Sequence, residues 1–467
     1  MTPRAGHQAF FHFNRTECAN PLAECVVGAI VAVVAIRSNA MILFRTPAPR
    51  ITWIGASAAF LGAAACGGTT DIITPPPPPP PPAGLTVTIV ADVDDRATAE
   101  HLGWGAGIPG VDVSIAPSDS SAPARSFRTG PDGAFSVTDL APRDYLIETS
   151  RWLTPSEKSL LVPGDDAVGF VGRAGLRIAT DTRTATITTP ASRQRAMVIS
   201  EWALNPGATP GQGESYPYGG FLELHNNSDS TVYLDGMALG RAVSSDYDYP
   251  SFPCGQMAQW SDDPAGVWTL AYQVFPGAGR DHPVFPGGTV VIATDAIDHR
   301  SLYPGSVDLS GADFEFAGSN DVDNPSVPNL INTGYDADLG GHGVLAISNG
   351  DVVFLSRPFL ASSVPLTRYP GTSQRLHPRI PRDHLLDVLA VRTNFDSGLP
   401  ECPRLVHSNF DRDGFRGRGT NEAVEYQHSV ERRAAPSQVS GRTLLQHTRD
   451  GAADFVRGSR TPGTVPE

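Results

Sequence analysis

Glycine and proline make up close to a fifth of this chain, with 47 Gly and 42 Pro among 467 residues. Inside a helix glycine costs about 1 kcal/mol and proline about 3 kcal/mol relative to alanine, so this composition excludes coiled coils and helical bundles. It favours short strands that are joined by many turns. Hydrophobic residues make up 40% of the chain, which is enough for a core and excludes global disorder. We therefore expect an all-β fold.

Two apolar stretches precede residue 66, at 25–36 and at 51–65. Each is shorter than the roughly 20 residues that a membrane-spanning helix needs. The second stretch follows two arginines and ends in four small residues, Gly-Ala-Ala-Ala. A charged region, an apolar run and a small-residue cleavage site in this order are typical of a signal peptide. We therefore expect the protein to be exported.

The residue directly after these small residues is Cys66, and Gly67 and Gly68 follow it. This segment resembles the signal of bacterial lipoproteins, in which the cysteine thiol is acylated before cleavage. The resemblance implies that Cys66 carries a lipid anchor, and the glycine after it implies transit to the outer membrane. One position departs from the pattern, because Ala63 stands where leucine is usual. The alternative is an ordinary cleaved signal peptide in which Cys66 has no special role.

The lipoprotein signal predicts how the first 83 residues are organised. Met41 would be the true start, residues 1–40 a mis-called extension, and residues 41–65 the signal peptide. Residues 66–83 would form the lipidated linker, which contains eight consecutive prolines at Pro75–Pro82. As polyproline II these prolines span about 25 Å at roughly 3.1 Å per residue. The folded part would then stand off the outer membrane of the cell envelope, on its periplasmic or its surface-exposed face.

The formal net charge is −14, because 49 acidic residues outnumber 35 basic ones. A general basic surface for nucleic acid is excluded by this balance, since phosphates would be repelled. We therefore expect no nucleic-acid partner. The expected partners are the membrane, through the lipid anchor, and an envelope protein or a glycan.

Of the five cysteines, two precede the signal peptide and Cys66 is the lipidation site, which leaves Cys254 and Cys402. In an oxidising compartment two cysteines favour one disulfide over a metal pair. Their wide separation in the sequence leaves two free thiols as the alternative.

Residues 84–190 show alternating β residues and a Gly-Pro-Asp-Gly turn at 130–133. Proline presets φ and Asp-Gly supplies a left-handed corner, so the turn predicts a hairpin. The segment resembles the carboxypeptidase regulatory-like, transthyretin-type β-sandwich, although Arg143 stands where that family has a glycine. The matching positions are Gly133, Phe135, Leu140, Pro142 and Tyr145. The resemblance implies a non-catalytic spacer or a carbohydrate-binding-like module.

Residues 196–467 contain pieces with period-two alternation, which indicates antiparallel strands with one buried face. The clearest pieces are Ile-Ser-Glu-Trp at 199–202, Phe-Leu-Glu-Leu-His-Asn-Asn at 221–227 and Val-Tyr-Leu-Asp-Gly at 232–236. Their order resembles the lamin-tail-like, immunoglobulin-type fold and, more closely, a bacterial lipoprotein family of unknown function built around it. We therefore expect two β-sandwich domains, of which the second has long loops.

Complete catalytic motifs are missing from the sequence, including Gly-x-Ser-x-Gly, His-Glu-x-x-His and a P-loop. Glu201 and Glu223 could form a pair of catalytic carboxylates, but the lamin-tail resemblance implies that they cap turns or accept backbone hydrogen bonds. We therefore expect a non-catalytic binding protein. The alternative is a metal-dependent hydrolase of the phosphoesterase or nuclease type, since lamin-tail-like domains are sometimes attached to such enzymes.

Asn409, Asp411 and Asp413 place oxygens at alternate positions before Gly414, as the first half of an EF-hand loop does. They form the candidate calcium site, and no other cofactor is expected. Thr420 stands where that loop needs a glutamate, so a solvated Asx-turn loop is the alternative.

Four tyrosines lie in loops that are rich in Pro, Gly and Ser, and they form the candidate binding surface. They are Tyr216, Tyr218, Tyr247 and Tyr249. Exposed aromatic rings could stack on sugars or anchor a protein partner. Packing of the loops onto the sandwich is the alternative.

Overall fold

The structure is a computed structural model, and each statement below concerns the residues that it describes. These are residues 84–203, 219–244, 254–302, 305–318, 323–333, 351–369, 376–392, 402, 404–416, 428–439 and 441–466, with the backbone of 207–208 and 215–216. All of them belong to one compact unit, Pro78–Glu467, and the predicted signal peptide, Cys66 and the polyproline run lie outside the described residues. Within these ranges no helix has the length and apolar character needed to cross a membrane.

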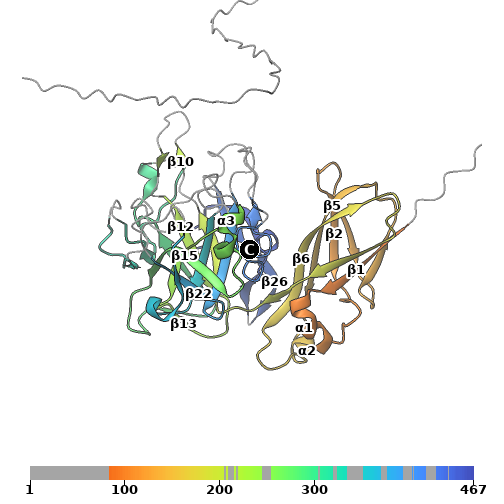
Figure 1. Cartoon of the computed structure of the whole chain (residues 1–467), viewed down its shortest axis with the longest axis horizontal. Coiled ribbons are helices and arrows are strands. Elements are labelled where there is room, and N and C mark those ends of the chain that lie inside the picture. Colours follow the sequence, from red (N-terminus) through yellow and green to blue (C-terminus); the bar gives the residue numbers. More distant parts are fainter. Residues whose placement is uncertain are drawn as a thin grey trace, which may run out of the picture. The chain divides into compact units, whose positions relative to one another are not determined.

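The first part of the unit is a sandwich of a three-stranded and a five-stranded sheet (Figure 1). The first sheet has the order β4-β1-β7, and β1 pairs with β7 in parallel. The second sheet has the order β3-β2-β5-β6-β8. The strands are β1 (Leu85–Ala91), β2 (Asp112–Pro117), β3 (Arg125–Arg128), β4 (Ala134–Val137), β5 (Arg143–Trp152), β6 (Ala167–Ile178), β7 (Thr184–Thr189) and β8 (Ala191–Arg193). The short helices are η1 (Val93–Asp95), α1 (Arg96–His101) and α2 (Pro155–Lys158).

The core of this sandwich contains the inward residues of both sheets, such as Val87, Val113 and Ile147. The expected turn is present, since Gly133 has φ +76° and donates its N–H to the carbonyl oxygen of Gly130 at 3.0 Å. The predicted hairpin is wrong, because β3 before the turn pairs with β2 in the five-stranded sheet and β4 after it pairs with β1 in the three-stranded sheet. The turn therefore takes the chain from one sheet of the sandwich to the other. Tyr145 is buried, and its hydroxyl donates to the carbonyl oxygen of Ala141 at 3.0 Å, as a corner tyrosine does.

The second part is built from two larger sheets. A six-stranded sheet has the order β18-β17-β12-β9-β25-β28, and an eight-stranded sheet runs β21-β22-β15-β14-β20-β23-β24 with β19 beside β15. The strands of the first are β9 (Met197–Ala203), β12 (Phe221–Asn226), β17 (Thr289–Ala293), β18 (Phe314–Glu315), β25 (His428–Arg432) and β28 (Phe455–Ser459). Those of the second are β14 (Ala238–Ala242), β15 (Gly266–Val274), β19 (Ile331–Asn332), β20 (Asp351–Ser356), β21 (Leu366–Thr367), β22 (His377–Pro381), β23 (Leu385–Arg392) and β24 (Phe415–Arg416).

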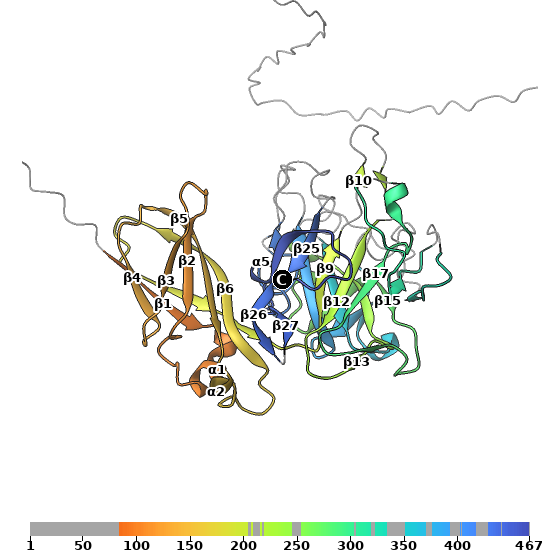
Figure 2. The ribbon, with the colours of Figure 1, turned by 180° about the vertical axis from the view of Figure 1, so that it is seen from behind.

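Small two-stranded pairs and short helices complete this part. The pairs are β10 (Gly207–Ala208) with β11 (Ser215–Tyr216), β13 (Val232–Tyr233) with β16 (Pro283–Val284), and β26 (Ala434–Val439) with β27 (Arg442–Leu445). The helices are α3 (Cys254–Ser261), η2 (His299–Ser301), η4 (Ala361–Ser363) and α5 (Gly451–Asp454). Figure 2 shows β9, β12, β17 and β25 as neighbours, with β26 and β27 on the side of β6.

The largest hydrophobic core contains residues of both large sheets, including Ile199, Leu224, Ile292, Val353 and Leu389. A second cluster joins the eight-stranded sheet to the segment 404–416. The predicted all-β, sandwich-type fold is therefore confirmed, with only short helices among the described residues.

A disulfide joins Cys254, the first residue of α3, to Cys402, with their Cα atoms 5.5 Å apart. The two cysteines are 148 positions apart in the sequence. The bond therefore closes a large loop that contains strands β15 to β23.

Candidate functional site

Three glutamates lie side by side on the six-stranded sheet, since Glu201 of β9 pairs with Glu223 of β12 and with Glu431 of β25. Glu201 accepts from the N–H of Thr461 at 3.1 Å and from its hydroxyl at 3.2 Å. Glu223 accepts from the N–H of Gly463 at 2.7 Å. These two carboxylates therefore hold the segment that follows β28 against the sheet.

Burial raises the pKa of Glu223 to about 7, although the hydrogen bonds from Gly463 and Ser200 favour its charged form. Burial also raises the pKa of Glu201. Both side chains are 1% exposed or less, and their oxygens are occupied by protein donors. Glu201 and Glu223 are therefore structural groups that accept hydrogen bonds, as the lamin-tail resemblance implied.

Asp411 of the candidate calcium site is buried and accepts three backbone N–H groups, from Ala390, Gly414 and Gly451, at 2.8–2.9 Å. It therefore ties β23 to the loop before β24 and to α5. Asn409 donates its own N–H to Nδ1 of His407 at 3.1 Å, and its carbonyl oxygen accepts from Arg449. In the described part of the chain, no group of three or more His, Cys, Asp or Glu side chains could hold a metal ion. The structure adds no support for calcium at Asn409, Asp411 and Asp413.

The four candidate tyrosines are not placed by the structure. Tyr218, Tyr247 and Tyr249 lie outside the described residues, and of Tyr216 only the backbone, in β11, is described. Their binding role stays a prediction.

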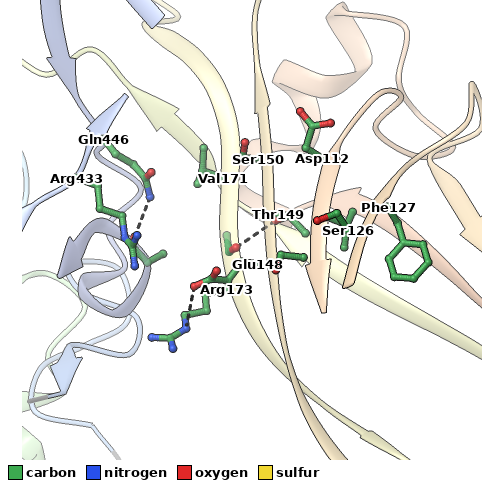
Figure 3. A pocket seen from close by; sticks show the side chains of 14 residues that line it. Asp112, Ser126, Phe127, Glu148, Thr149, Ser150, Val171, Arg173, Arg433 and Gln446 are labelled. Carbon is green, nitrogen blue, oxygen red and sulfur yellow. Dashed lines mark hydrogen bonds and ion pairs between the residues drawn. The ribbon is translucent and has the colours of Figure 1, made fainter. Parts of the chain in front are cut away.

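A cavity of about 480 Å³ lies between the outer face of the five-stranded sheet and the segment around β26, β27 and α5. Figure 3 shows Arg433 and Gln446 on one side of it and Glu148, Arg173 and Ser126 on the other. A second cavity, of about 450 Å³, shares Ser150, Arg433 and Gln446 with the first. We call these two connected cavities the groove.

Because side chains alternate between the two faces of a strand, the sheet has an outer face that forms one polar wall of the groove. In β2 and β5 the residues Val113 and Ile147 point into the sandwich core, so their neighbours point outward. The register aligns Ser126, Ser114, Glu148 and Arg173 in one row across β3, β2, β5 and β6. The outer face of the sheet therefore offers hydroxyl, carboxylate and guanidinium groups to a ligand.

Some of the charged side chains at the groove form ion pairs, and others do not. Arg173 Nε lies 3.6 Å from Glu148 Oε1, and Arg128 Nη1 lies 3.1 Å from Asp112 Oδ1. The guanidinium of Arg433 makes no hydrogen bond or ion pair with the described residues. Burial lowers the pKa of Arg433, and the nearby Arg173 lowers it further, against the charges of Glu148 and Asp454.

The opposite wall is fixed by a buried ionic network directly beside the groove. Arg432 is 1% exposed and contacts Asp387 Oδ2 at 2.5 Å and Asp454 Oδ2 at 3.4 Å. His447 Nε2 lies 3.2 Å from the other oxygen of Asp387. Gln446 donates its side-chain amide to the carbonyl oxygen of Ala453 at 3.0 Å. These bonds hold β25, β27 and α5 in one rigid wall.

An apolar contact joins the two walls beside the groove. Trp152 of β5 lines the second cavity and packs against Val168, Ala435 and Leu444. In addition, the N–H of Arg193 donates to the carbonyl oxygen of His447 at 2.9 Å. The walls of the groove are therefore connected by both hydrophobic and hydrogen-bonded contacts.

None of the groove residues was singled out by sequence reasoning. The available signal was the run of polar residues at alternate positions of β2 and β5, namely Asp112, Ser114, Glu148 and Ser150. That pattern is equally typical of a solvent-exposed sheet face, so it could not identify a site without its second wall.

The comparisons with known proteins point to one family. A family model described as "Protein of unknown function (DUF4876)" matches residues 285–462, which is less than half of the chain. A search of the curated proteins found no match.

Two solved structures were compared with the chain. One is the crystal structure of a DUF4876 family protein from Bacteroides thetaiotaomicron, with 16% identity and a TM-score of 0.43, covering 82% of this chain and 98% of that one. The other, from Bacteroides uniformis, is titled "a putative carbohydrate binding protein" and has 9% identity, a TM-score of 0.14, and coverage of 67% and 100%. At these TM-scores neither likeness carries an argument. Over residues 285–462 the chain is thus similar to a family of unknown function, as the sequence predicted, whereas its lipoprotein character and the lamin-tail-like domain stay predictions.

Proposed function

We propose that the protein is a non-catalytic binding protein of the cell envelope that takes a glycan in the groove. The observation that carries this proposal is the cavity of about 480 Å³ whose walls, from two distant parts of the chain, both present polar side chains. Its volume falls in the range of about 300–1,000 Å³ that is typical of ligand pockets. Protein-partner binding at the predicted tyrosine loops is the other form that the binding role can take.

The chemistry of the groove suits a sugar. Sugar hydroxyls both donate and accept hydrogen bonds. The hydroxyls of Ser114, Ser126 and Ser150 can likewise act as donor or as acceptor. Apolar surface is also present, because Val171 and Ala453 line the same cavity. Mixed polar and apolar walls of this kind allow both the hydroxyls and the C–H faces of a sugar ring to be contacted.

The binding test uses a bulky side chain to block the groove. Ser114→Trp places an indole on the outer face of β2 inside the cavity, whereas the control Ser136→Trp places one on the exposed outer face of β4. We expect isothermal titration calorimetry against a panel of neutral and acidic polysaccharides to show a binding member. Its affinity should fall at least tenfold in Ser114→Trp and stay unchanged in the control. Equal affinities in both variants would refute the groove as the site.

We also propose that Cys66 carries the lipid anchor, as the signal sequence predicts. Two acyl chains would hold the protein at a membrane through the burial of methylenes, about 0.8 kcal/mol each. Cys66→Ser should move the protein from the membrane fraction to the soluble fraction, and unchanged fractionation would refute the anchor. Release of phosphate from a generic phosphoester in the presence of zinc or calcium would favour the hydrolase alternative over a non-catalytic role.

A further inference from the structure

The groove contains a cation without an anionic partner. Arg433 follows Arg432 in the chain, and the two have opposite environments. Arg432 is paired with both Asp387 and Asp454, whereas the Arg433 guanidinium has no hydrogen-bond or ion-pair partner among the described residues and lines both cavities. A partly desolvated, unpaired charge is unfavourable for the fold, so its presence in a cavity points to a ligand.

A second guanidinium belongs to the same part of the groove. Arg173 lines the same cavity as Arg433, and its charge lowers the pKa of Arg433. Its contacts are long, 3.6 Å from Nε to Glu148 and 3.5 Å from Nη1 to the carbonyl oxygen of Ala452. Of the carboxylates that act on Arg433, Glu148 is the ion-pair partner of Arg173, and Asp454 is bound by Arg432. Asp112 is paired with Arg128.

Acidic and basic side chains line the groove in equal number, namely Asp112, Glu148 and Glu431 with Arg173, Arg432 and Arg433. At the first cavity, however, the guanidinium of Arg433 has no ion pair among the described residues and that of Arg173 has only a long one. An anion placed between the guanidiniums would relieve their mutual repulsion and form charge-assisted hydrogen bonds with both. Guanidinium donors match carboxylate oxygens in a bidentate geometry, and they match sulfate oxygens in a similar way.

We propose that the ligand of the groove is an acidic glycan, whose anionic group is bound by Arg433 and Arg173 while its hydroxyls contact the serines of β2, β3 and β5. This inference rests on the proposed glycan site and specifies its ligand class. The anionic group is a carboxylate or a sulfate, and the row of Ser114 and Ser126 beside Glu148 and Arg173 supplies the neutral hydrogen bonds.

The test compares acidic glycans with their charge-neutralised counterparts on the full protein. The probes are polygalacturonate and fully methyl-esterified polygalacturonate, hyaluronan and its methyl ester, and chondroitin sulfate with its desulfated, methyl-esterified form. We expect at least one acidic member to bind tenfold or more tightly than its neutral counterpart, with affinity that falls as salt rises. Binding of the carboxylate polymers indicates a carboxylate as the anionic group, and binding of chondroitin sulfate alone indicates a sulfate.

Substitutions of Arg433 then test whether its charge causes the preference for acidic glycans. Arg433→Gln should weaken binding of the acidic glycan at least tenfold, and Arg433→Lys should keep part of the affinity. The matched control is Arg177→Gln, which removes the same charge from β6 at a side chain that is 84% exposed. The control should bind as the wild type does. The melting temperature of Arg433→Gln should stay close to that of the wild type, because the guanidinium has no hydrogen bond or ion pair among the described residues and its desolvation and the repulsion from Arg173 oppose its attraction to Glu148 and Asp454.

The outcomes separate this inference from the proposed function. Equal binding of acidic and neutral members, with loss in Ser114→Trp, would overturn the acidic-ligand inference and leave the glycan site intact. Acidic binding that Arg433→Gln does not weaken would also overturn the inference. Absence of binding by every member of the panel would count against both.

Discussion

Replacing Glu223 by glutamine should remove a pH dependence of stability that its burial creates. Burial raises the pKa of Glu223 from 4.5 to about 7. A group whose pKa is higher in the folded state binds more protons there than in the unfolded state between the two values. The free energy of unfolding should therefore fall as the pH rises from about 4.5 to about 7.

The size of this effect follows from the shift of about 2.5 pH units. At about 1.36 kcal/mol per unit, ionised Glu223 lowers the free energy of unfolding by about 3 kcal/mol between pH 4.5 and pH 8. Glutamine keeps the size of the side chain and an oxygen that can accept from the N–H of Gly463, but it does not ionise. The free energy of unfolding of Glu223→Gln, relative to that of the wild type, should therefore rise by about 3 kcal/mol between pH 4.5 and pH 8.

The assay is urea denaturation of wild type and variant at several pH values, followed by circular dichroism. Buried carboxylates that do not interact with Glu223, such as Asp450 with a pKa raised by burial to about 8, titrate in both proteins and cancel in the difference. Glu100→Gln, at an exposed position of α1, is the control and should leave the wild-type profile unchanged. Parallel profiles for Glu223→Gln and wild type would show that Glu223 is ionised in the folded protein at neutral pH and would refute the reasoning.

Three further changes should alter the free energy of unfolding, measured by urea denaturation. Gly133→Ala should cost about 1–3 kcal/mol, because residue 133 has φ +76° and an added Cβ would lie 2.5 Å from the carbonyl carbon of Gly107; a wild-type midpoint would contradict this. Arg432→Met should cost about 3–5 kcal/mol by taking the buried guanidinium away from Asp387 and Asp454, and the added change Asp387→Leu should recover part of the loss. Replacing both Cys254 and Cys402 by serine should cost about 2–5 kcal/mol, because the bond closes a loop of 148 residues, and a reducing agent should bring the wild type to the same midpoint.

The local features of the fold were predictable because their causes are local. The Gly-Pro-Asp-Gly turn forms through the φ values that its residues prefer, and alternation in β2 and β5 separates core residues from outward ones. Tyr145 could be assigned to a corner for the same reason, since its hydroxyl bonds only four residues back. The hairpin predicted from that turn is wrong because a turn fixes only the local reversal of the chain and not which strands pair.

The groove could not be predicted, because its walls meet only in three dimensions. Arg432 and Arg433 show the difficulty: they are adjacent and chemically identical, yet one is neutralised by Asp387 and the other faces a cavity. The alternate spacing of Asp411 and Asp413 is also compatible with two different roles. Oxygens at that spacing suit a cation, but the fold directs three backbone N–H groups at Asp411 instead.

The position of β9 in its sheet has a consequence for how the chain matures on the ribosome. Trp202 pairs with Leu222 on one side and with Val430 on the other, so β9 gains its second neighbour only when β25 has been made. At 5–20 residues per second, synthesis of the intervening chain takes roughly 10–45 s. Throughout that time β9, whose seven residues are all buried in the finished protein, has an open edge with which another nascent chain can pair. Fragments that stop before residue 428 would keep that edge open permanently. Self-association, more than the loss of any single contact, should therefore limit the yield of soluble fragment.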